Sequence, residues 1–308
     1  MRWKKLGIIY RPDGTKSWAK THAMIPTPIR LNDEVIRVYT TFCDDHGIGR
    51  PGYVDVEAKN PKKVIGVSNS PLLELGAPGS FDDNGILTCS VVDMGNGHIA
   101  MYYVGFELST KVRYRLLTGL AISNDGGNTF HRHSLTPVLE RTNAERLFRG
   151  GPYCIHELNR YRLWYVAGSD WTDINGKAMP IYNLRYLESD DGIVWPEQGQ
   201  VIMDITAEDE HGFGRPCVIR KSGGGYRMFY SIRRRSLNAY RLGYAESTDG
   251  LTWHRMDDKL NLDVTPNEFD SEAIMYAAPI EVDGSLYVFY NGNDFGREGF
   301  ALALLEEE

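Results

Sequence analysis

Four carboxylates recur at one place in a repeated pattern of this sequence. Each lies seven residues before a proline, or before Ser90 where one repeat lacks the proline, and they are Asp83, Glu145, Asp209 and Glu272. Carboxylates gathered in one funnel push each other's pKa values apart, which gives one protonated acid and one ionised base or nucleophile. Cleavage of a glycosidic bond needs such a pair. We therefore take Asp83, Glu145 and Glu272 as candidate catalytic residues.

Other polar side chains of the same segments are candidates for binding a ligand. They are His22, Asp82, Arg149, His211, Arg215 and Asp270. The two arginines are flanked by glycines and could hold a carboxylate or phosphate through two hydrogen bonds, or could pair with nearby acids instead. The two histidines could carry protons or donate to a ligand. Their spacing matches no metal signature, so we expect neither a metal nor a cofactor.

These segments belong to a repeat of about 60 residues. Its clearest mark is an apolar run with a tyrosine, at Tyr39, Tyr103, Tyr165, Tyr230 and Tyr290. An apolar run about a dozen residues earlier, a turn-like link and a third run after the tyrosine indicate about four short strands per repeat. The sequence therefore predicts an all-β fold, a five-bladed β-propeller, with residues 1–308 as one domain.

The N-terminal segment has a predicted role in this fold. The last repeat ends after its third run, whereas "KLGIIYRP" is a strand without a repeat of its own. We expect this strand to join the last blade, which closes the ring and removes a free sheet edge. The polar segments then lie where the innermost strands begin, around one central funnel.

Three repeats end their third run in a similar turn. The turns read "SNDGGNTFHRH", "SDDGIVW" and "STDGLTWHR". Asp can bond its own backbone two residues on, Gly accepts positive φ, and Ser can bond back across the turn. Because these roles explain the residues without chemistry, we interpret the motif as part of the frame.

Composition and charge exclude several functions. The net charge of -7 gives no basic field for nucleic acid, and no apolar run is long enough to span a bilayer. The N-terminal apolar stretch "LGIIY" is too short for a signal peptide, so we expect a cytoplasmic protein. The four cysteines form no C-x-x-C pair, and three of them lie in apolar runs where we expect buried, inert thiols.

The whole pattern resembles a known group of enzymes. The repeats, the segment "PGSFDDNGI", the turns and the closing "FDSEAI…YVFYNGNDFG" are similar to the five-bladed glycoside hydrolases of families 32, 43, 68 and 130, and residues 123–130 resemble the Asp box of sialidases. In families 32 and 43 the resemblance implies an Asp on the first blade, an Asp on the second and a general acid Glu on the third. Asp83 or Asp82 matches the second and Glu145 the third. The first repeat has no acid there, although Asp44 and Asp45 follow one loop later.

The sequence thus predicts a carbohydrate-active, glycoside hydrolase-like enzyme. It would cleave or transfer a glycosyl group on a small, anionic sugar or sugar conjugate, without nucleic acid or membrane as partner. Two alternatives stay open. One is a non-catalytic sugar-binding propeller whose funnel acids are neutralised by Arg149 and Arg215, and the other is a lyase or isomerase with His22 or His211 as base.

Overall fold

Strands make up most of the structure, which is a computed structural model that describes residues 1–95, 97–237 and 239–308. The helices in these ranges are single turns, α1 (Asp257–Leu260) and α2 (Asn293–Gly296). Neither has the length and apolar content that crossing a membrane requires. The predicted all-β class is confirmed.

In the described part of the chain, antiparallel pairing divides the strands into five groups of four. The first three groups are β2 (Thr21–Arg30), β3 (Val35–Cys43), β4 (Gly49–Glu57) and β5 (Asn60–Val67); β6 (Ile86–Gly95), β7 (His98–Leu108), β8 (Tyr114–Ser123) and β9 (His131–Arg132); and β10 (Phe148–Glu157), β11 (Arg160–Ile174), β12 (Lys177–Ser189) and β13 (Gln200–Met203). The last two are β14 (Glu210–Arg220), β15 (Tyr226–Arg234), β16 (Ala239–Ser247) and β17 (His254–Arg255); and β18 (Met275–Val282), β19 (Ser285–Asn291), β20 (Phe300–Glu307) and β1 (Arg2–Tyr10).

Hydrogen bonding between the groups is limited. Short parallel pairings, β8 with β10 and β12 with β14, join the three middle groups into one 12-stranded sheet. The first and last groups are separate 4-stranded sheets. The groups therefore meet mainly through side chains.

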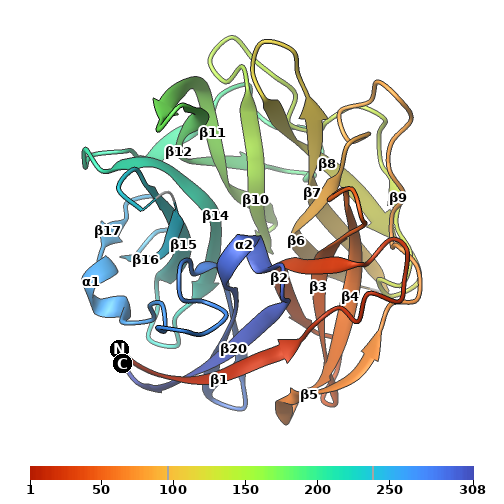
Figure 1. The fold of residues 1–308 in the computed structure, drawn as a ribbon, viewed down its shortest axis with the longest axis vertical. Coiled ribbons are helices and arrows are strands. Elements are labelled where there is room, and N and C mark those ends of the chain that lie inside the picture. Colours follow the sequence, from red (N-terminus) through yellow and green to blue (C-terminus); the bar gives the residue numbers. More distant parts are fainter. Residues whose placement is uncertain (96, 238) are drawn as a thin grey trace.

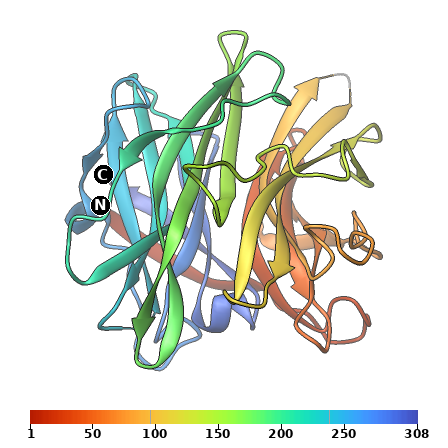
Figure 2. The ribbon, with the colours of Figure 1, turned by 90° about the horizontal axis from the view of Figure 1, so that it is seen from above.

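The N-terminal strand completes the last group. β1 pairs with β20 in antiparallel register, with Arg2 opposite Glu307 and Tyr10 opposite Phe300. The two termini consequently lie side by side in both views (Figure 1 and Figure 2). This pairing is the one expected for "KLGIIYRP".

The first strands of the groups surround the middle of the molecule (Figure 1). They contact one another in a circular order, β2 with β6, β6 with β10, β10 with β14, β14 with β18 and β18 with β2. Arg215 of β14 lies buried among them and donates to Thr27 Oγ1 at 2.7 Å, to the Cys89 carbonyl at 3.1 Å and to the Tyr276 carbonyl at 3.4 Å. One guanidinium thus connects strands of four groups.

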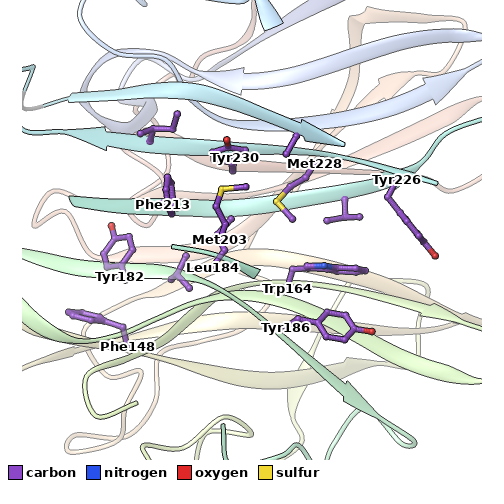
Figure 3. Close-up of a cluster of buried hydrophobic side chains, with 14 residues drawn as sticks. Phe148, Trp164, Tyr182, Leu184, Tyr186, Met203, Phe213, Tyr226, Met228 and Tyr230 are labelled. Carbon is purple, nitrogen blue, oxygen red and sulfur yellow. The ribbon is translucent and has the colours of Figure 1, made fainter. Parts of the chain in front are cut away.

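Large apolar side chains fill the space between neighbouring groups. Figure 3 shows this between the third and fourth groups, where Trp164 and Leu184 face Phe213, Met228 and Tyr230. All five side chains are fully buried. Burying a side chain of this size contributes about 2 kcal/mol, so this packing supplies much of the cohesion between groups.

The Ser-x-Asp-Gly turns of the second, third and fourth groups each bind their group to the one before it. In the fourth group the backbone amides of Thr252 and Leu251 donate to Asp249, which lowers the pKa of Asp249 to about 2. The Gly250 carbonyl accepts a hydrogen bond at 2.9 Å from Trp164 of the third group. Tyr102 bonds the turn of the third group in the same way, and Tyr39 that of the second. The motif acts in the frame, as interpreted from the sequence.

Each of the last four groups holds a buried carboxylate that pairs with a cation, and in three of them a tyrosine hydroxyl donates to the same carboxylate. In the second group Asp82 accepts the Tyr103 hydroxyl at 2.9 Å and Arg132 Nε at 2.8 Å. We call these sets the acid–tyrosine–cation clusters. The others are Glu145 with Tyr165, Arg149 and Arg185; Glu210 and Asp257 with Tyr230 and Arg255; and Asp270 with Tyr290 and Lys5. Each cluster ties the segment before the first strand to later strands of its group.

We expect Lys5→Met to destabilise the fold by roughly 2 kcal/mol, because it leaves the fully buried Asp270 carboxylate without its cation, whose Nζ lies 2.5 Å away. Urea unfolding measures the change. The matched control is Lys4→Met, since Lys4 is exposed. Equal unfolding midpoints for the two variants would show that the cluster does not hold β1.

Candidate functional site

A central cavity of about 520 Å³ is lined by residues from all five groups. Four tyrosines form much of its wall, and they are Tyr114, Tyr182, Tyr240 and Tyr276. Its cationic side chains are Arg113, Lys177 and Arg233. Of the described residues that line it, only Asp294 carries a carboxylate. The cavity is therefore aromatic and carries an excess of positive charge.

A side pocket of about 110 Å³ continues this cavity. The two spaces share Met179, Arg233, Tyr240, Asp294 and Phe295. The side pocket adds two of the residues predicted from the sequence, His211 and Glu272. A carboxylate pair, Glu272 and Asp294, thus lines one space together with an arginine and a histidine.

A wider hollow of about 740 Å³ lies away from the middle, between the second and third groups. Arg115 there pairs with Glu107, and Arg141 pairs with Glu140. Its open shape is that of a solvated surface. We base the site on the central cavity.

Three of the predicted acids are used inside the clusters. Glu145 is fully buried, with Arg149 Nε at 2.6 Å, Arg185 Nη1 at 3.0 Å and the Gly199 amide at 3.1 Å. Asp82 and Asp270 are likewise buried and paired, with Arg132 and Lys5. None of the three lines the central cavity or the side pocket. The charge of Glu145 is compensated by two arginines inside its cluster, and its predicted catalytic role stays a prediction.

The other acids near the first strands lie in turns. Asp83 Oδ2 accepts the Gly79 amide at 2.7 Å, and Asp209 binds the Ser236 hydroxyl at 2.8 Å. Asp44, considered as a replacement for the missing first acid, pairs with Arg50 at 2.8 Å. Asp83 is not among the described residues that line the cavity, although its neighbour Asn84 is.

The two predicted arginines are used internally. Arg149 binds Glu145 and donates to the carbonyls of Glu140 and Pro196. Arg215 holds the middle of the fold through the hydrogen bonds described above. Both side chains are at most 3% exposed, so neither guanidinium is presented to a ligand.

The two histidines differ in position. His22 is not among the described lining residues, and its Nδ1 lies 2.8 Å from Thr21 Oγ1. His211 lines the side pocket, with Nδ1 3.0 Å from the Pro180 carbonyl. A carbonyl oxygen only accepts, so Nδ1 carries the hydrogen and Nε2 keeps a lone pair. Burial lowers the pKa of His211, which keeps the ring neutral near pH 7.

Of the carboxylate pair, Glu272 was predicted from the sequence as a candidate site residue and Asp294 was not. Both are exposed, and Glu272 sits just before β18, where its backbone amide binds Asn293 Oδ1 at 2.8 Å. Asp294 and Phe295 have φ of 50° and 58°, the left-handed region that costs energy for side chains with Cβ. This backbone holds the Asp294 side chain at the cavity wall.

The sequence reasoning missed Arg233, Tyr240 and Asp294. They lie near the end of β15, at the start of β16 and in α2, whereas the residues predicted from the sequence lie in the segments around the start of the first strands. Two signals were present, the arginine run "SIRRRS" and the Asp of "YNGNDFG". Neither indicates which side chain turns inward.

The four cysteines are free and buried; burial was predicted for Cys89, Cys154 and Cys217, and Cys43 is buried as well. Burial raises the pKa of the Cys89 thiol to about 12, so it is a poor nucleophile at neutral pH. The described residues include no group of three or more His, Cys, Asp or Glu side chains placed to hold a metal ion.

Two curated relatives align with nearly the whole chain. Uncharacterized protein MT1551 of Mycobacterium tuberculosis strain CDC 1551 / Oshkosh is 33% identical over 99% of this chain and 100% of its own length. Uncharacterized protein Rv1502 of strain ATCC 25618 / H37Rv has the same identity and coverage. No protein-family model matches the chain.

Solved structures share the fold at low sequence identity. A glycoside hydrolase covers 99% of this chain and 92% of its own, with a TM-score of 0.75 and 18% identity. A thermostable family-43 glycoside hydrolase covers 96% of this chain and 93% of its own, with a TM-score of 0.67 and 17% identity. A glycosyl hydrolase from Bacteroides ovatus covers 93% of this chain and 84% of its own, with a TM-score of 0.63 and 13% identity. The chain therefore has the fold of glycoside hydrolase propellers, which confirms the resemblance seen in the sequence at the level of fold.

We expect Glu145→Gln to destabilise the protein by about 3 kcal/mol, because it leaves Arg149 and Arg185 without their buried counter-charge. Chemical unfolding provides the measurement. Glu140→Gln is the matched control, since Glu140 is 54% exposed and its loss should cost under about 0.5 kcal/mol. A Glu145→Gln protein as stable as the control would contradict the structural role.

We also expect the stability to fall as the pH drops through the range set by His211. Burial holds the pKa of His211 below its usual 6.5, so the unfolded chain takes up the proton first and unfolding becomes easier below about pH 6.5. Thermal unfolding between about pH 7.5 and 5.5 follows this change. The slope should be smaller in His211→Gln and unchanged in His254→Gln, where the histidine is exposed. Identical slopes in all three proteins would rule out this contribution.

Proposed function

The chain belongs to the family of the mycobacterial proteins MT1551 and Rv1502, and we propose that it is a carbohydrate-active, glycosidase-like protein. It would cleave or transfer a glycosyl group of a small, negatively charged sugar or sugar conjugate in the central cavity. The fold shared with glycoside hydrolases supports the substrate class. The observation that carries the proposal is the carboxylate pair Glu272 and Asp294 beside that cavity.

We interpret the five groups of strands as the blades of one propeller domain closed into a ring. The circular contacts of the first strands support this interpretation. So does the pairing of β1 with β20, which gives the last group its fourth strand. A ring of this kind brings one wall from each blade to a single cavity, where five short segments can surround one sugar.

The size of the cavity suits a small ligand. A volume of about 520 Å³ lies within the usual range of small-molecule sites. Tyr114, Tyr240 and Tyr276 offer ring faces for stacking, together with hydroxyl groups for hydrogen bonding. Both features are common in sites that bind a sugar ring.

Glu272 and Asp294 are our candidates for the acid and base, in place of Asp83 and Glu145. The reaction needs one carboxyl group to protonate the leaving oxygen and a second, ionised one to act on the sugar carbon or on water. Both carboxylates line one small pocket, so two separate carboxyl groups are present there for the two roles. Both are exposed and can therefore reach a ligand.

The residues that would bind the negative charge of the ligand differ from the two arginines predicted from the sequence. Arg149 and Arg215 are occupied inside the protein. Arg113, Lys177 and Arg233 line the cavity instead, opposite the single carboxylate of Asp294. An excess of cations at a concave surface favours an anionic ligand.

A second candidate reaction is a lyase or isomerase step with His211 as the base. The observation in its favour is the neutral ring of His211, whose Nε2 lone pair is free to take a proton. His22, the other predicted base, does not line the cavity. The two reactions require different residues and are separated by the following test.

We expect Glu272→Gln and Asp294→Asn each to lower turnover of a cleavable aryl glycoside by about 100-fold or more, with little change in stability. A panel of nitrophenyl glycosides, neutral and acidic, identifies the substrate. Matched controls are Glu268→Gln and Asp283→Asn, which change exposed acids outside the cavity.

Full turnover in either carboxylate variant would overturn the assignment of the pair. Loss in His211→Gln alone would favour the second reaction. Binding of a sugar without any product over a long incubation would favour the non-catalytic alternative.

A further inference from the structure

Arg233 is placed differently from its two neighbours in the arginine run. It lies near the end of β15, and its side chain lines both the central cavity and the side pocket. Arg234 instead approaches Asp209 at 3.8 Å, and Arg235 donates to Thr172 at 3.1 Å. Only Arg233 of the three directs its charge into the cavity.

The Arg233 guanidinium has unused donors. Its Nε donates to the Tyr240 hydroxyl at 2.6 Å, and the group lies 4.5 Å from the centre of the Tyr240 ring. Within the described residues it forms no ion pair with a carboxylate, and Nη1 and Nη2 donate to no other group. Glu272 and Asp294 line the same side pocket but are not paired with it.

An arginine in such a place needs a partner. Removing a charge from water is costly unless an opposite charge or several acceptors replace the water. Four tyrosine rings line the cavity with Arg233 and offer weak compensation, and Glu272 and Asp294 line the side pocket without pairing with it. The two free amino groups of the guanidinium match the two coplanar oxygens of a carboxylate.

The neighbouring tyrosines add a further donor. The Tyr182 and Tyr240 hydroxyl oxygens are 3.1 Å apart, so one of them donates to the other. Whichever donates, the second hydroxyl keeps a hydrogen that no other described residue accepts, and both residues line the cavity. Burial raises the pKa of Tyr182 well above its usual value, so the hydroxyl stays protonated. Arg233 and this tyrosine pair therefore present three donors to the cavity.

We propose that Arg233, Tyr182 and Tyr240 form a subsite for the carboxylate of an acidic sugar, such as a hexuronate. This inference rests on the proposed function in one respect, which is that the sugar binds in the central cavity. It adds the chemical class of the substrate. A single guanidinium balances the single charge of a carboxylate, whereas the other cations, Arg113 and Lys177, are exposed at the rim. A phosphate dianion carries a second negative charge, which the one guanidinium does not balance.

The test is calorimetric titration with hexuronates, the parent neutral hexoses and hexose 6-phosphates. We expect at least one uronate to bind about tenfold or more tightly than its parent hexose, a difference of about 1.4 kcal/mol. Arg233→Gln should abolish that preference, Arg233→Lys should restore part of it, and Tyr240→Phe should weaken it. Arg234→Gln, the matched control outside the cavity, should bind like the wild type.

Three results would overturn the subsite. They are the absence of any preference for a uronate, a preference that persists in Arg233→Gln, and tighter binding of hexose 6-phosphates than of uronates. Binding is measured without turnover, so the test is independent of the glycosyl chemistry. A uronate preference that depends on Arg233 would stand even if Glu272→Gln and Asp294→Asn left turnover unchanged.

Discussion

A carboxylate stays buried only when hydrogen-bond donors and a positive charge surround it, and this constraint is met in a similar way in four successive groups of strands. In the second group a tyrosine of the second strand and an arginine of the outer strand hold Asp82. In the last group Tyr290 and Lys5 hold Asp270. Because each buried acid lies just before the first strand of its group or, for Glu210, at the first residue of that strand, these contacts fix the segments that lead to the middle of the molecule. The buried acids of the clusters thus hold the segments that form the walls of the cavity.

This use of the acids decides what chemistry the cavity can contain. With the buried carboxylates of the clusters compensated by their own cations, the groups open to a ligand come from β8, β12, β15, β16 and β18, from the segment just before β18 and from the α2 segment. They comprise tyrosines, Arg233 and the exposed acids Glu272 and Asp294. The fold is that of glycoside hydrolases, yet the residues that face the cavity are not the ones that the family pattern indicates.

The repeat was visible in the sequence because each group has a tyrosine at the same position of a buried strand. The apolar residues around each tyrosine follow the pattern of a strand, so the five runs look alike. The turn motif was equally readable, since its Ser, Asp and Gly act within a few residues of one another.

The residues of the candidate site could not be identified in the same way. An acid in a polar segment has the same sequence signature whether it faces a ligand or an arginine, and the partner of Asp82, Arg132, comes from a strand of two residues. Choosing Arg233 from three adjacent arginines requires the strand register, which the repeat does not supply. Glu272 was found because its segment reaches the cavity rim.

The last cluster also orders events during synthesis of the protein. β1 is synthesised long before its partner β20, which begins at Phe300, and before Asp270, the acid that binds Lys5. Trp3, whose indole packs against Phe229, and Ile8 therefore stay exposed until nearly the whole chain has been made. Contacts of such long sequence separation form slowly. The nascent chain thus carries an unpaired apolar strand through translation, a segment that a chaperone could shield until the last group of strands has formed.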